Sequence, residues 1–176
     1  VVRGNEMFRE KMVESSKLIV IQGGPQTTLP YAIDREEDDL TLSQMTEGAI
    51  EFLNRGKEGF FLMVEGGLID YACHVNDAAT TFREVEDFAD AIQKAYEFYL
   101  KHPDETLIVV TADHETGGIV LGTGSYQLNL RVLENQRVSL EKLTHEIREL
   151  RDMKSNQVEW EDVQEMLAKN LGFWNM

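Results

Sequence analysis

The sequence predicts an α/β fold, a doubly wound and mainly parallel sheet with flanking helices, of which this chain holds an incomplete part. Apolar runs of strand length occupy residues 60–64 and 106–111, and an amphipathic helical pattern of about six turns lies between them. Strand, helix and strand in this order form a right-handed crossover, so both strands should end at the same edge of one sheet. We therefore expect residues 1–176 to form part of a single domain.

The chain before the first of these strands shows a helical and then an irregular pattern. It predicts a helix over 5–16, a short strand over 18–21 and a loop over 22–40. Thr41 and Gln44 have the spacing of a capping box, in which a hydroxyl and an amide each satisfy a free backbone N–H at a helix start. Apolar residues then recur with helical period at Leu42, Met45, Ala49, Ile50 and Leu53.

The helix between the two strands has one continuous apolar stripe, whose members are spaced alternately by four and three residues. They are Ala78, Phe82, Val85, Ala89, Ile92, Tyr96 and Tyr99. Asp77 precedes this helix and is predicted to cap it, and Pro103 ends it. The acidic positions off the stripe are assigned to the side that faces water; they are Glu84, Glu86, Asp87 and Asp90.

The C-terminal third of the chain has a weaker pattern. Turn residues at Gly122, Gly124 and Asn129 indicate short strands, and apolar spacing then predicts helices over 140–150 and 163–171.

Composition excludes several classes of function. The 17 basic and 32 acidic residues give a net charge of −15, which argues against nucleic acid and anionic membrane surfaces as partners. No apolar run is long enough to span a bilayer, and the lone Cys73 excludes an internal disulfide. Such an acidic chain would repel a phosphate ester unless bound cations reversed the local field.

Carboxylate and imidazole side chains follow the ends of both predicted strands. Glu65 comes directly after the first strand, and Asp70 and His74 follow with a spacing of four, which places them on one face of a helical turn. Asp113 and His114 leave the second strand at a tight turn. Either pair alone could arise by chance, but two pairs at one sheet edge favour a metal site. Three carboxylates and two imidazoles suit Zn²⁺ with a harder ion beside it.

The segments around these residues resemble the alkaline phosphatase family. The similarity is carried by residues 59–77, which contain Glu-Gly-Gly-Leu-Ile-Asp, and by residues 109–118, which contain Asp-His-Glu-Thr-Gly-Gly. The similarity covers roughly residues 25–122 well and the flanking residues weakly. The resemblance implies a doubly wound α/β sheet and the hydrolysis of phosphate monoesters with two Zn²⁺ and one Mg²⁺.

The resemblance also implies roles for individual residues. Asp70 and His74 would be ligands of the first zinc, Asp113 and His114 ligands of the second zinc, and Glu65 a ligand of the magnesium. It further implies a small phosphomonoester as substrate, a homodimeric parent protein and a periplasmic or extracellular location.

Several parts of the family's site have no match in this chain, among them the nucleophile and the last zinc ligand. The family's nucleophile is a serine that follows an aspartate, and no serine here does so; the serines are Ser15, Ser16, Ser43, Ser125, Ser139 and Ser155. The family's last zinc ligand is a histidine in a His-Thr-Gly context, and no His-Thr pair occurs. We therefore expect no catalytic residue in this chain, weak metal binding, negligible activity of the chain alone, and self-association through an unpaired sheet edge.

Two alternatives remain open at this level. The chain could belong to another member of the same superfamily, such as a phosphodiesterase or a phosphoglycerate mutase, although the two motifs favour the phosphatase. It could also be a non-catalytic metal-binding or structural domain that kept the motifs.

Overall fold

The computed structural model describes residues 2–3, 8–21, 29–119 and 129–174, and within them the chain is mainly helical. The elements in chain order are β1 (Val2–Arg3), α1 (Phe8–Glu14), β2 (Val20–Ile21), α2 (Leu42–Leu53), α3 (Gly67–His74), α4 (Ala78–Lys101), the 3₁₀-helix η1 (Leu130–Asn135), α5 (Leu140–Met153) and α6 (Trp160–Leu171). β1 and β2 pair in parallel, with Val2 beside Val20. The predicted start of the first helix, much of the predicted loop over 22–40 and the turns at Gly122 and Gly124 lie outside the described residues.

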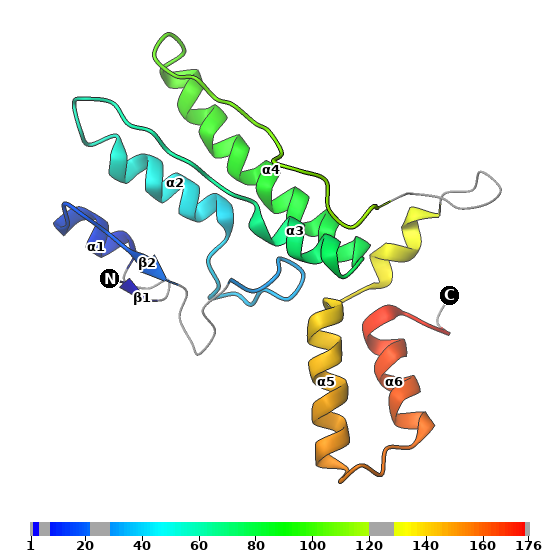
Figure 1. Cartoon of the computed structure of the whole chain (residues 1–176). Coiled ribbons are helices and arrows are strands. Elements are labelled where there is room, and N and C mark those ends of the chain that lie inside the picture. The colour runs from blue at the N-terminus through cyan, green and yellow to red at the C-terminus, as the bar shows by residue number, and fades with distance from the viewer. Residues whose placement is uncertain (1, 4–7, 22–28, 120–128, 175–176) are drawn as a thin grey trace.

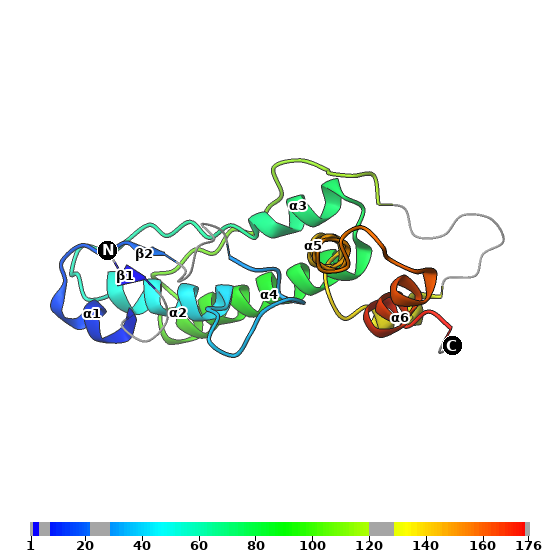
Figure 2. The same ribbon diagram turned by 90° about the horizontal axis from the view of Figure 1, so that it is seen from below.

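The helices form two groups (Figure 1). α2 and α4 lie side by side, and α3 packs against the N-terminal part of α4. α5 and α6 form a helical hairpin that projects from the same end of α4, as the view from below also shows (Figure 2). α3 therefore lies near the junction of the two groups.

The start of α2 confirms the predicted capping box. The Thr41 hydroxyl accepts the Gln44 N–H at 3.0 Å, and the Gln44 side-chain oxygen accepts the Thr41 N–H at 3.0 Å. Both bonds satisfy backbone donors that have no partner within the helix. The predicted helices around α4, α5 and α6 are also present.

The two strands predicted over 60–64 and 106–111 are not formed, so that prediction was wrong. Both segments run extended beside the helices, but no backbone hydrogen bond joins them within the described chain. One face of each segment points outward, because Phe61 is 88% exposed and Leu107 is 87% exposed. A strand needs a neighbouring strand to pair its N–H and C=O groups, and the part of the chain that is described supplies none. The doubly wound sheet is accordingly not confirmed.

The buried face of α4 also differs from the prediction. The bounds of the helix agree with it, but Tyr96 of the apolar stripe is 45% exposed. The helix instead buries Thr80, Glu84 and Ala91. This side faces α2, whose N-terminal Leu42 N–H donates to Asp87.

Two acidic residues that were assigned to the water-facing side of α4 are in fact enclosed. Asp87 forms a bidentate ion pair with Arg35, with both N···O distances at 2.9 Å. Glu84 is 5% exposed and accepts the Ala32 N–H at 2.6 Å. Burial raises the pKa of Glu84 above its ordinary value, although the bond from Ala32 opposes this. The segment before α2 therefore covers this part of α4.

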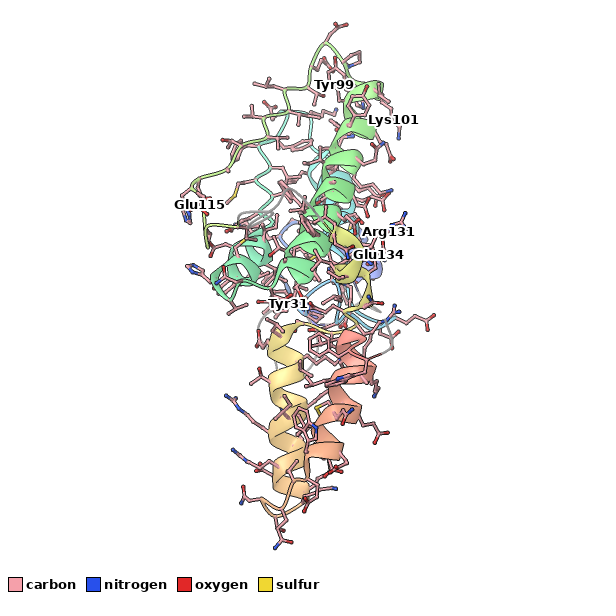
Figure 3. The ribbon with its side chains drawn as sticks, turned by 90° about the vertical axis from the view of Figure 1, so that its right-hand side faces the viewer. Tyr31, Tyr99, Lys101, Glu115, Arg131 and Glu134 are labelled. Atoms are coloured by element: carbon pink, nitrogen blue, oxygen red, sulfur yellow. The ribbon has the colours of Figure 1, made fainter. Side chains whose placement is uncertain are left out.

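Asp77 joins the two groups of helices, and its predicted role as the cap of α4 is confirmed. It is 2% exposed, and one carboxylate oxygen accepts the Thr80 N–H at 3.2 Å. The same carboxylate accepts the Thr80 hydroxyl, the Gln136 amide and the Leu140 N–H, each at 2.7 Å. Asp77 therefore caps α4 and satisfies a free N–H at the start of α5. Tyr31 lies at this junction (Figure 3), and burial together with nearby carboxylates raises its pKa to about 12.

Candidate metal centre

The first pair of predicted ligands lies on α3. Asp70 and His74 are four residues apart on this helix, so their side chains lie one turn apart on the same face. The His74 Nε2 atom is 3.3 Å from Asp70 Oδ2. Both side chains remain accessible to solvent, so this face of α3 can receive an ion.

The second pair lies on the turn that follows the extended segment 106–111. The His114 N–H donates to Asp113 Oδ1 at 3.0 Å, and His114 Nε2 is 3.5 Å from Asp113 Oδ2. The turn is closed by Glu115, whose carboxylate accepts the Gly118 N–H at 2.6 Å. Figure 3 shows Glu115 on this turn, which runs close to α3.

Thr116 brings the two pairs together. Its hydroxyl donates to Asp70 Oδ1 at 2.6 Å and lies 3.0 Å from His114 Nδ1. Gly117, the next residue, packs against the end of α3: a Cβ at this position would overlap the Cys73 carbonyl oxygen and lie 2.8 Å from its carbon. The second turn therefore docks directly on the helix that carries Asp70 and His74.

Glu65 is not bonded to any of the other four predicted ligands. It precedes α3 and is exposed, and no hydrogen bond or ion pair links it to Asp70, His74, Asp113 or His114, all of which are described. Within the described residues, no group of three or more His, Cys, Asp or Glu side chains gathers into a complete ion site. The structure thus brings the two predicted Asp–His pairs together and shows no bond from Glu65 to either of them.

The hydrogen bonds of His114 determine which of its ring nitrogens is free. Nδ1 lies 2.8 Å from the Glu115 carbonyl oxygen, and a carbonyl can only accept. Nδ1 therefore carries a proton, and in the neutral ring Nε2 holds the lone pair. The bond to Glu115 and the nearby Asp113 carboxylate raise the pKa of His114.

The geometry of each pair fits a tetrahedral zinc ion. Zn–N and Zn–O bonds of about 2.1 Å place two ligand atoms of one tetrahedral ion about 3.4 Å apart. The N···O separations here are 3.3 Å in the first pair and 3.5 Å in the second. Each pair can thus occupy two of the four corners around such an ion.

Thr116 is the residue that sequence reasoning missed. Its position two residues after His114 is visible in the sequence, but a threonine in a turn gives no sign that its hydroxyl will reach a carboxylate 46 residues away. Only the docking of the turn on α3 creates this contact.

Comparison with known proteins identifies the family. The sequence profile of the alkaline phosphatase family matches residues 13–172. The chain belongs to the alkaline phosphatase family. It is 50% identical over 94 residues to alkaline phosphatase 3 of Bacillus subtilis, and 42% identical over 108 residues to the repressible alkaline phosphatase of Saccharomyces cerevisiae.

Solved alkaline phosphatases share the arrangement of this chain. The cold-active alkaline phosphatase of a psychrophilic Shewanella superposes with a TM-score of 0.74 at 34% identity, covering 97% of this chain and 40% of that one. The Thermus thermophilus alkaline phosphatase gives a TM-score of 0.70 at 28% identity, covering 97% and 35%.

The match spans only part of each alkaline phosphatase. The aligned regions cover 53% of this chain and 20% of the Bacillus protein, and 56% of this chain and 19% of the yeast protein. No described helix is long and apolar enough to cross a membrane.

Proposed function

We propose that this chain carries the metal-ligand part of an alkaline phosphatase that hydrolyses small phosphate monoesters with two Zn²⁺ and one Mg²⁺. The observation that supports the proposal most directly is the pair of N···O separations, 3.3 Å for His74 with Asp70 and 3.5 Å for His114 with Asp113. Both match the spacing of neighbouring ligands on one zinc ion.

Each residue has a distinct role in this proposal. Asp70 and His74 hold the first zinc, Asp113 and His114 hold the second, and Glu65 holds the magnesium. Bound to these side chains, the ions would supply the positive charge that stabilises an in-line displacement at phosphorus.

The net charge of the chain opposes the binding of a phosphate ester, so the bound ions must offset it. With a net charge of −15, the chain alone repels a phosphate ester. Each proposed zinc is held by one carboxylate and one neutral imidazole, so each pair leaves its ion with a net positive charge. Ions held by these residues would therefore reverse the local field where the substrate binds.

The proposal places the nucleophile outside this chain. The attacking group would be a serine in an Asp-Ser context, which this sequence lacks. The parent protein would be an exported homodimer, periplasmic or extracellular.

The proposal is tested first by metal binding. We expect the 176-residue chain to bind Zn²⁺ saturably but more weakly than a closed four-ligand site, because each ion would have two protein ligands. Competition against a chromogenic chelator measures this affinity. Asp113→Asn should weaken binding, whereas Asp104→Asn, which changes an exposed aspartate outside both pairs, should not. Equal affinities of these two variants would contradict the assignment.

Activity gives a second test. With Zn²⁺ and Mg²⁺ supplied, the chain alone should not turn over a chromogenic phosphomonoester above the metal blank. Turnover that disappears in Asp113→Ala would show instead that this chain contains its own nucleophile.

A further inference from the structure

The hydroxyl of Thr116 contacts both predicted ligand pairs. It lies 2.6 Å from Asp70 Oδ1 on α3 and 3.0 Å from His114 Nδ1 on its own turn. The Thr116 side chain is partly buried, which limits competition from water for these bonds.

The direction of both hydrogen bonds follows from the donors present. A hydroxyl has one proton, and a carboxylate oxygen can only accept it, so Thr116 donates to Asp70. Towards His114 the Thr116 oxygen must therefore accept, and the donor is Nδ1–H. The Glu115 carbonyl, 2.8 Å from the same nitrogen, independently requires that proton.

These bonds determine which atoms remain available to an ion. Asp70 uses Oδ1 for the Thr116 hydroxyl, and its Oδ2 lies beside His74 Nε2 at 3.3 Å. His114 uses Nδ1 for its two acceptors, and its Nε2 lies beside Asp113 Oδ2 at 3.5 Å. Both pairs thus present one imidazole Nε2 and one carboxylate oxygen.

We propose that Thr116 is a positioning residue that couples the two ligand pairs, orienting Asp70 to bind a divalent metal ion through Oδ2 and His114 to bind one through Nε2. This inference rests on the proposed metal-binding function of the same residues. Partners of this kind fix the orientation and the tautomer of metal ligands, and their loss typically weakens metal binding about 10- to 100-fold.

The test compares three threonine variants of the 176-residue chain by titration with Zn²⁺ and with Co²⁺, whose visible absorption reports the ligand geometry. Thr116→Val keeps the shape of the side chain and removes the hydroxyl, and should weaken binding at least about 10-fold. Thr116→Ser restores the hydroxyl and should bind within about 3-fold of the unmodified chain. Thr111→Val is the matched control, because Thr111 donates only to the Ala112 carbonyl.

The outcomes separate this inference from the proposed function. If the unmodified chain binds Zn²⁺ saturably and Thr116→Val has the same affinity and the same Co²⁺ spectrum, Thr116 does not couple the two pairs. The proposed metal site is unaffected by that result. Equal losses of Zn²⁺ affinity in Thr116→Val and Thr111→Val also overturn the coupling role, because any threonine substitution in this segment would then weaken binding. Absence of saturable binding by the unmodified chain overturns the proposed metal site and this inference with it.

Discussion

Gly117 lies so close to Cys73 that a Cβ on the glycine would overlap the cysteine carbonyl oxygen. The contact joins the turn of the second ligand pair to the C-terminal end of the helix that carries the first. It is independent of the Thr116 hydroxyl bonds, since it is made by backbone atoms. The two proposed ligand pairs are therefore held together by a backbone contact and by a side-chain hydroxyl.

We expect Gly117→Ala to separate the ligand pairs and to reduce Zn²⁺ affinity at least about 10-fold, because the new methyl group cannot be accommodated against backbone. Gly118→Ala is a matched control. Both glycines have positive φ, 77° and 60°, so both substitutions carry a backbone penalty of about 1–2 kcal/mol, but a Cβ at Gly118 meets no atom within 4 Å. Equal zinc affinities in the two variants, measured by competition titration, would show that the contact does not hold the site.

Asp77 should be one of the most sensitive positions for stability. Asp77→Ala leaves the donors of Thr80, Gln136 and Leu140 without their shared acceptor at a site that is 2% exposed. We expect the free energy of unfolding to fall by about 3 kcal/mol or more, because each buried unsatisfied donor costs about 1–3 kcal/mol. Urea unfolding measures this. Asp90→Ala, on the exposed side of the same helix, should change stability by about 0.5 kcal/mol at most.

Glu84 should make stability depend on pH in a direction unusual for an acid. Burial raises its pKa in the folded chain above the ordinary value of 4.5, so the folded state binds this proton more tightly than the unfolded state. The contribution of Glu84 is therefore most favourable below pH 4.5 and is lost as the pH rises through the raised value.

Glu84→Gln keeps an acceptor for the Ala32 N–H and removes the titration. Glu84→Gln does not lose stability through this titration as the pH rises. We therefore expect the free energy of unfolding of the variant, relative to that of the unmodified chain, to be higher at pH 8 than at pH 4. Urea unfolding at the two pH values gives the comparison, with the exposed Glu105→Gln as control. A relative stability that is the same at both pH values would contradict the expectation.

The outward faces of the two unpaired extended segments should cause self-association. Phe61 and Leu107 are 88% and 87% exposed, and the backbone of neither segment is paired within the described chain. Exposed apolar side chains on unpaired extended backbone favour pairing with another chain. Sedimentation velocity over a concentration series should show association, which the double substitution Phe61→Ser with Leu107→Ser reduces.

Met153→Ser is the control for this experiment, because Met153 is comparably exposed but lies at the end of α5, away from both segments. A single monomeric species at all concentrations would refute the expectation.

Local sequence was a good guide to helices. The capping box at Thr41 and Gln44 formed as predicted, and so did the cap at Asp77. Both signals depend on residues within one helical turn of each other, and their bonds form wherever the helix forms. The spacing of Asp70 and His74 on α3 follows from the same short-range geometry.

Predictions that needed a distant partner were less successful. The apolar runs over 60–64 and 106–111 remained unpaired, because a strand is stabilised only by the strand beside it. The buried side of α4 was also misassigned. Glu84 and Asp87 have the spacing of a polar face, but the Ala32 N–H and the Arg35 guanidinium enclose them.

The order of residues alone therefore determined the family, most helices and the spacing of the two Asp–His pairs, since each depends on short stretches of chain. Only the tertiary structure decided that Thr116 joins Asp70 to His114, and that Gly117 docks their turn on α3. The physical reason is the separation of the residues along the chain. Helical spacing fixes which residues a few positions apart are neighbours, whereas a contact across 46 residues depends on how the elements pack.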